Sequence, residues 1–215
     1  MKKPEGIQFV RLADAPQSAW RNGGGFKQDL LQTPDMLVGV AQITRGGDFS
    51  HYADQQRFFA IIEGAGVELG DPPVRLTSSS QVHEFAGEDA PICSLIAGAA
   101  TAFNLMVKRS TAKGFMRRVP IAVDSARSNI FWSTPLSAKP NQQASLNTYA
   151  SRSLGVFVNH SAVLTERIGD ASVDHVLNAS GIAWISNCAS VPNWSLRPIN
   201  EADKLDAIVF EVIVA

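Results

Sequence analysis

The chain has 215 residues, of which 45% are hydrophobic and 18% are charged, and its formal net charge is −1. This length can bury a core in one large domain or two small ones, and the composition excludes a disordered chain. A net charge near zero argues against a general nucleic-acid or anionic-membrane binder, so we expect neither nucleic acid nor membrane among the partners.

The first residues and the cysteines indicate where the protein resides. The basic start at residues 1–6 is not followed by an apolar run, so we predict no signal peptide. The weakly polar run at 90–105 is shorter than the roughly 20 apolar residues of a membrane helix. Cys93 and Cys188 are too few for a disulfide scaffold. We therefore expect a soluble, cytoplasmic protein with reduced cysteines.

Short apolar or alternating runs predict a series of strands in the first half of the chain. They lie at 7–12, 36–44, 58–62, 67–69, 82–85, 92–96 and 103–107. The run at 58–62 is continuous, as in a strand buried on both faces. The two glycines in 63–66 predict a hairpin turn into the next strand.

The second half continues in the same style. Strands are predicted at 130–132, 154–158, 162–165, 173–177, 182–186 and 207–214, and 195–205 could hold one helical turn. A polar link at 108–114 and a turn-rich loop at 137–145 place a boundary between residues 108 and 147. Many short strands separated by Gly and Pro predict an all-β sandwich or barrel architecture, here as two similar units.

The sharpest local motif is at residues 20–25, Trp-Arg-Asn-Gly-Gly-Gly, which ends in three consecutive glycines. Such glycines permit positive φ or close backbone approach, and the N–H groups of Gly23, Gly24 and Gly25 could form an anion site. Arg21 would add a planar fork suited to a carboxylate. The alternative is a tight loop with a surface arginine.

A second polar cluster, residues 46–52, comes shortly before Arg57 and the apolar run at 58–62. Polar side chains at such a place can project into a barrel mouth. A charge directly before a buried strand needs a partner, which a ligand anion would supply. The alternative is that Arg57 extends to the rim beside Glu63 or Asp54.

Asn104 lies within the apolar run at 103–107. Strand alternation puts Phe103 and Leu105 on one face and Asn104 and Met106 on the other. An amide that faces a cavity can both donate and accept hydrogen bonds. The alternative is an asparagine that caps the end of a strand.

Metal and common catalytic motifs are missing from the sequence. The four histidines, at positions 51, 83, 160 and 175, form no His-x-His or His-x3-His pair, so we expect no metal and no cofactor. There is no Gly-x-Ser-x-Gly elbow and no P-loop. The basic residues between 108 and 118 are interpreted as a solvated linker.

Taken together, these motifs resemble the HutD/Ves family of double cupins. The matching stretches, in order over about residues 5–120, are Trp-Arg-Asn-Gly-Gly-Gly at 20–25, Asp-Phe-Ser at 48–50, Arg57, residues 63–69, Phe-Ala-Gly-Glu at 85–88, and Phe-Asn-Leu-Met at 103–106 followed by Arg109. The resemblance implies a bicupin fold of two jelly-roll-like β-barrel units packed together, without the usual cupin metal ligands. It also implies a link to histidine utilisation or stress response. The implied role in histidine utilisation is to bind the pathway intermediate formylglutamate and so limit flux through the pathway.

The sequence departs from the family pattern at four places. Asp48 replaces a proline, residues near 52–54 replace Phe-Pro-Gly, Ala102 replaces an aspartate, and Lys27 stands where the family has a threonine. These changes alter the polar groups of the expected pocket, so the ligand is expected to differ from that of the histidine-pathway members.

We therefore predict an N-terminal cupin-like barrel at 1–118, with the pocket, and a degenerate one at 119–215. The expected function is metal-independent binding of a small anionic metabolite that carries a carboxylate, in a regulatory or stress-related role. The alternative is a cupin isomerase or hydrolase acting on a sugar or amino-acid derivative, with His51 or Glu63 as acid or base. A homodimer would be compatible with this fold. The predicted ligand-binding residues are Arg21, Asn22, Gly23, Gly24, Gly25, Ser50, His51, Arg57 and Asn104.

Overall fold

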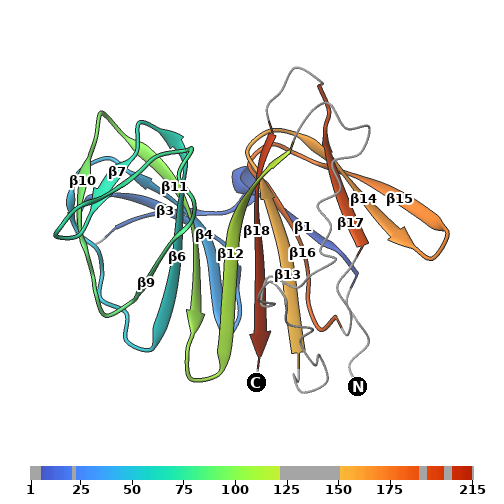
Figure 1. The fold of residues 1–215 in the computed structure, drawn as a ribbon, viewed down its shortest axis with the longest axis horizontal. Coiled ribbons are helices and arrows are strands. Elements are labelled where there is room, and N and C mark those ends of the chain that lie inside the picture. The colour runs from blue at the N-terminus through green and yellow to red at the C-terminus, as the bar shows by residue number, and fades with distance from the viewer. Residues whose placement is uncertain (1–5, 21–22, 122–150, 189–192, 201–204, 215) are drawn as a thin grey trace. The chain divides into compact units, whose positions relative to one another are not determined.

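The computed structural model describes residues 6–20, 23–121, 151–188, 193–200 and 205–214, and all of its regular structure is β except for one short 3-10 helix (Figure 1). Residues 12–114 form one compact unit, and the segments before and after them form a second. The all-β prediction is confirmed. Among the described residues, no helix has the length and apolar character needed to cross a membrane.

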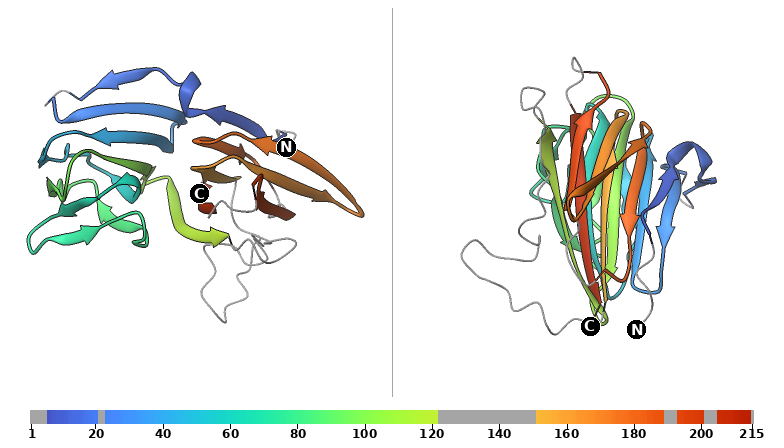
Figure 2. Two further views of the ribbon diagram at one scale, coloured as in Figure 1. Left: turned by 90° about the horizontal axis from the view of Figure 1, so that it is seen from above. Right: turned by 90° about the vertical axis from the view of Figure 1, so that its right-hand side faces the viewer.

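The first unit contains a six-stranded antiparallel sheet and a smaller four-stranded sheet; Figure 2 shows its strands, blue to green, from two further sides. The six-stranded sheet has the order β2 (Gln17–Ala19), β3 (Gly25–Gln32), β4 (Met36–Ile43), β11 (Ala100–Lys108), β6 (Gln55–Gly64) and β9 (His83–Ala86). The four-stranded sheet has the order β5 (Gly47–Asp48), β10 (Ile92–Leu95), β7 (Val67–Leu69) and β8 (Val74–Leu76). The 3-10 helix η1 (Leu12–Asp14) precedes them.

The core of this unit lies between its two sheets. Ile43, Phe59 and Ile61 from the large sheet join Val67 and Leu69 from the small sheet in one buried cluster. The side chains of β6 from Arg57 to Ile62 are all buried, which confirms the prediction of a strand buried on both faces. Strand alternation then places Arg57 on the same face as the core residues Phe59 and Ile61.

The glycines at 64 and 66 do not make the predicted hairpin. Instead of pairing with each other, β6 pairs with β11 and β9, whereas β7 pairs with β10 and β8. Gly64 and Gly66 have φ of 87° and 101°. A Cβ at Gly66 would lie 2.1 Å from the carbonyl oxygen of Leu76. The two glycines thus turn the chain from the large sheet into the small one.

The described residues of the second unit also form two sheets. The larger has the order β1 (Gln8–Arg11), β16 (Gly181–Ile185), β13 (Ser151–Val158), β18 (Leu205–Val214) and β12 (Ala112–Ile121). The smaller has the order β15 (Ala171–Leu177), β14 (Ala162–Ile168) and β17 (Asn193–Pro198). A buried cluster that includes Leu154, Val156 and Leu164 fills its interior.

Three expectations for the boundaries and the second half need correction. The N-terminal strand β1 pairs with β16, so it belongs to the second unit rather than to a 1–118 barrel. The supposed linker continues into β12, where Arg118 is buried. The predicted helical turn at 195–205 is wrong for its first residues, because they lie in β17 and pair with β14. The predicted strand at 130–132 and the loop at 137–145 lie outside the described residues.

Candidate functional site

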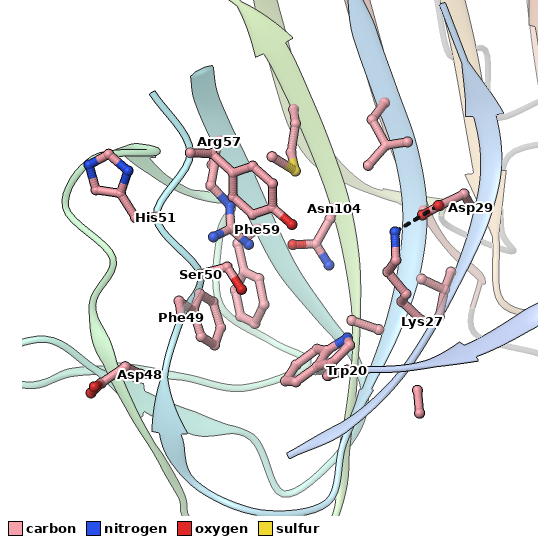
Figure 3. A pocket seen from close by; sticks show the side chains of 17 residues that line it. Trp20, Lys27, Asp29, Asp48, Phe49, Ser50, His51, Arg57, Phe59 and Asn104 are labelled. Carbon is pink, nitrogen blue, oxygen red and sulfur yellow. Dashed lines mark hydrogen bonds and ion pairs between the residues drawn. The ribbon is translucent and has the colours of Figure 1, made fainter. Parts of the chain in front are cut away.

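A pocket of about 480 Å³ opens within the first unit, on the face of the large sheet that also carries the core (Figure 3). The floor consists of side chains that alternate along neighbouring strands. Phe59, Asn104, Gly39 and Asp29 stand opposite one another in successive pairs across β6, β11, β4 and β3. Residues directly opposite in an antiparallel pair point to the same face. One row of the sheet therefore crosses the pocket from Phe59 to Asp29.

Arg57 stands beside this row, opposite Met106 on β11 and Phe85 on β9. Its side chain is only 8% exposed, and its Nε and Nη1 atoms have no hydrogen-bond partner among the described residues. Burial lowers the pKa of Arg57 to about 10, because desolvation disfavours the cation, although the Tyr52 hydroxyl opposes this effect. The guanidinium nevertheless remains charged at neutral pH.

Three aromatic rings surround the Arg57 guanidinium. Its Cζ atom lies 5.0 Å from the ring centroid of Phe49, 4.9 Å from that of Phe85 and 5.7 Å from that of Tyr52. Such rings attract a cation through their electron-rich faces but supply no hydrogen-bond acceptor in its plane. This aromatic cage therefore stabilises the charge in part and leaves its N–H groups to an anion.

The alternative in which Arg57 pairs at the rim with Glu63 or Asp54 is wrong. The carboxylate of Asp54 accepts hydrogen bonds from Ser110, at 3.1 Å from its backbone nitrogen and 2.5 Å from its hydroxyl. Glu63 is exposed and does not contribute to the pocket lining. The acid–base role considered for Glu63 in the enzyme alternative has no support from its position.

The segment from Asp48 to Tyr52 forms one wall of the pocket and supplies two rings of the aromatic cage. Its backbone is fixed at both ends, where Phe49 N donates to Pro91 O at 3.1 Å and Tyr52 N donates to Gly87 O at 2.8 Å. Just beyond, Glu88 accepts a hydrogen bond from Asp54 N at 2.7 Å and forms an ion pair with Arg109. The family-like residues Gly87, Glu88 and Arg109 thus hold this wall in place.

The opposite side of the pocket carries an ion pair. Lys27 and Asp29 are two apart on β3, so both face the pocket, and the Lys27 Nζ lies 2.8 Å from the Asp29 Oδ2. Their side chains are 40% and 35% exposed. Figure 3 shows Asn104 between this pair and Arg57.

The structure gathers four of the predicted site residues in this pocket: Ser50, His51, Arg57 and Asn104. His51 is exposed at the rim, whereas Asn104 lies in the middle of β11, so it does not cap a strand. The amide nitrogen of Asn104 donates a long hydrogen bond of 3.4 Å to Ala102 O. The pocket lining also includes residues that the sequence analysis did not select: Trp20, Lys27, Asp29, Phe49, Tyr52, Phe59 and Met106.

The glycine run serves the fold instead of the pocket. Gly23, Gly24 and Gly25 are not among the lining residues, which differs from the prediction. Gly23 has φ of 68°, and a Cβ at Gly25 would lie 2.0 Å from the carbonyl oxygen of Gln42. These glycines form a tight turn against the end of β4, as in the alternative interpretation. Arg21 and Asn22 lie outside the described residues.

Within the described part of the chain, no three His, Cys, Asp or Glu side chains gather in a way that could hold a metal ion. The His83 ring stacks on Phe85 with ring centroids 5.6 Å apart. Burial lowers the pKa of His83. Cys93 and Cys188 are free thiols. The chemistry that this pocket offers is therefore that of a buried cation, an ion pair, an amide and aromatic rings.

Comparison with known proteins places the chain in a family. The HutD family model matches residues 12–192. An uncharacterized protein from the hutC 3′ region of Pseudomonas putida is 30% identical over 109 residues. That match covers 46% of this chain and 57% of the relative, so the chain aligns with little more than half of the relative's length.

Solved structures agree in fold. A conserved protein of unknown function from Pseudomonas aeruginosa PAO1 has a TM-score of 0.75 at 16% identity, covering 98% of this chain and 100% of that one. HutD from Pseudomonas fluorescens SBW25 has a TM-score of 0.66 at 18% identity with the same coverage. A variant of oxalate decarboxylase from Bacillus subtilis has a TM-score of 0.55 at 8% identity, covering 95% of this chain and 76% of that one. The expected all-β, cupin-like fold is confirmed, but in the described residues each unit consists of two open sheets instead of the predicted closed barrel.

Proposed function

The chain belongs to the HutD family, which is linked to histidine utilisation, and we propose that it binds a small carboxylate-bearing metabolite in the pocket of its first unit without a metal ion. Arg57 carries this proposal. A buried guanidinium without an anionic partner opposes folding, and a ligand carboxylate would offset that effect at the moment of binding. The pocket around it is large enough for a small metabolite.

The other lining residues support a binding role. A carboxylate bound in the pocket would neutralise the Arg57 guanidinium, whose buried Nε and Nη1 atoms have no partner among the described residues. Ser50 and Asn104 would form hydrogen bonds with the remaining polar groups of the ligand. The charge, the aromatic rings and the ion pair bind and orient a molecule. The lining groups that could act as an acid or base are either exposed, as Asp48, His51 and Tyr52 are, or engaged in an ion pair, as Lys27 and Asp29 are. A regulatory role through reversible binding therefore fits the site better than catalysis does.

Thermal melting tests this function. Protein treated with EDTA is melted with a panel of small mono- and dicarboxylates, including formylglutamate, the ligand that the family resemblance implies. We expect at least one compound to raise the melting temperature of the wild type and to leave that of Arg57→Met unchanged. Arg75→Met is the matched control, because Arg75 is exposed on β8 beside Glu68 and does not line the pocket.

Two results would contradict the proposal. One is a melting temperature that no compound changes. The other is an equal response of the wild type and the Arg57→Met variant. If the ligand is recovered chemically altered after incubation, the protein is an enzyme and the regulatory reading is wrong.

A further inference from the structure

The charges that line the pocket restrict the kind of carboxylate that it accepts. Arg57 is the one lining cation that is both buried and without a partner among the described residues. It therefore calls for a single negative charge. The other charged lining residues either pair with each other, as Lys27 and Asp29 do, or lie exposed at the rim, where solvent screens them, as Asp48 and His51 do.

The Lys27–Asp29 pair presents a donor and an acceptor at the same place. Lys27 Nζ has further N–H groups beyond the one directed at Asp29, and a carboxylate has more lone pairs than one hydrogen bond uses. A neutral amide or hydroxyl can accept from Lys27 and donate to Asp29 together. A second ligand carboxylate would face Asp29, and a ligand ammonium would face Lys27, so each would meet a like charge.

Arg57 and the Lys27–Asp29 pair lie over the same face of the large sheet. Three strand spacings of about 4.8 Å, or ~14 Å in all, separate the backbones of β6 and β3, and the long Arg57 and Lys27 side chains extend over the face between them. Gly39 lies between Asp29 and Asn104 in the row and adds no side chain to this space. A small extended molecule can therefore contact Arg57 with one end and the Lys27–Asp29 pair with the other, passing Asn104.

We infer that the ligand is a monocarboxylate whose other end is a neutral amide or hydroxyl, an inference that rests on the proposed function of this pocket. Arg57 binds its carboxylate, and the Lys27–Asp29 pair selects the neutral end against a second carboxylate or an ammonium group. On this basis the second carboxylate of a compound such as formylglutamate weakens binding to this chain. The selecting lysine stands at one of the positions where the sequence departs from the family pattern.

Three probes of equal chain length test this inference. Glutaramate, glutarate and 5-aminopentanoate share a carboxylate and five carbons, and they differ in an amide, a carboxylate or an ammonium at the other end. Isothermal titration of the full chain measures each affinity, together with the four- and six-carbon homologues. The comparison is made at the length that binds most tightly. We expect the amide to bind at least about ten-fold more tightly than the other two compounds, the discrimination that one mismatched polar group typically supplies.

Two variants should redirect the preference. Asp29→Asn leaves Lys27 as an unpaired cation, so the dicarboxylate should become the tightest ligand. Lys27→Met leaves Asp29 as an unpaired anion, so the ammonium compound should gain relative to the amide. Arg57→Met should abolish binding of all three. Because both redirecting residues are partly exposed on a strand of the large sheet, their variants are expected to fold, which melting curves check.

The failures of the two proposals are distinguishable. If the wild type binds dicarboxylates as tightly as the amides through Arg57, or if Asp29→Asn leaves the ranking unchanged, this inference is overturned and the proposed function stands. If the wild type binds none of the compounds at any length, or binds them without Arg57, both are overturned.

Discussion

Replacing Arg57 by methionine should stabilise the protein in the absence of ligand. The substitution retains most of the length and apolar contacts of the side chain and removes the guanidinium, whose Nε and Nη1 have no partner among the described residues. The charge is surrounded by Phe49, Tyr52 and Phe85, so the removed group leaves an apolar environment that suits a thioether.

The size of the effect follows from the lowered pKa of Arg57. One unit of pKa corresponds to about 1.4 kcal/mol, so a folded-state pKa of about 10 places the cost of burying this cation at about 3 kcal/mol. Because the unfolded chain binds the proton more tightly, this cost is fully present at neutral pH and declines only above about pH 10. Cation–π contacts return about 0.5–1 kcal/mol per ring, or about 1.5–3 kcal/mol for the three rings. The net stabilisation by Arg57→Met should therefore be at most about 1.5 kcal/mol.

Urea unfolding followed by circular dichroism measures this difference. We expect the midpoint to rise while the slope of the free energy against urea stays the same. The control Arg75→Met, which removes an exposed arginine, should change the free energy of unfolding by less than about 0.5 kcal/mol. A loss of more than about 1 kcal/mol in Arg57→Met would refute the reasoning, because Arg57 would then be part of a structural ion pair.

Three further predictions concern other parts of the chain. In the second unit, Arg152 Nε lies 2.9 Å from Glu211 Oε1 in the interior, so Arg152→Met should lower the free energy of unfolding in urea by about 3–5 kcal/mol. The double variant with Glu211→Leu should recover most of this loss, and a double variant as unstable as the single one would contradict the prediction. The hydrogen bond from Asp54 N–H lowers the pKa of Glu88, so the stabilisation by this carboxylate is present at neutral pH and is lost as the pH falls through the lowered pKa; unfolding measured against pH should show a smaller acid loss in Glu88→Gln than in the wild type, and parallel curves would argue against it. Burial raises the pKa of Cys93 to about 11, so iodoacetamide at pH 8 should label this thiol in the native protein far more slowly than in the unfolded chain, and equal rates by mass spectrometry would disprove its burial.

The sequence predicted the β-rich fold and four of the pocket residues because those features depend on local pattern. Arg57 was recognisable because a charge directly before five apolar residues is unusual in a buried strand. Asn104 was recognisable because strand alternation separates it from Phe103 and Leu105. Most strands had a clear apolar run, and the structure places a strand at each predicted run within the described residues.

The remaining features depend on contacts that a local pattern does not contain. The segment that forms β3 is too polar to read as a strand, so the Lys27–Asp29 pair was missed. The aromatic cage joins residues from a loop and from β9, and only the tertiary structure brings them to Arg57. The glycine run permits positive φ and close backbone approach, which an anion site and a tight turn need equally. The sequence pattern therefore does not distinguish ligand binding from a structural turn.

The central claim is that a ligand carboxylate binds Arg57 without a metal ion. The Nε–H signals of protein labelled with ¹⁵N-arginine test it most directly, with the Arg57 signal assigned by its loss in Arg57→Met. We expect that glutaramate, added to EDTA-treated protein, shifts the Arg57 signal in a saturable way and leaves the Arg75 signal in place. An Arg57 signal that stays unmoved while calorimetry reports binding, or binding that requires restored metal, would contradict it.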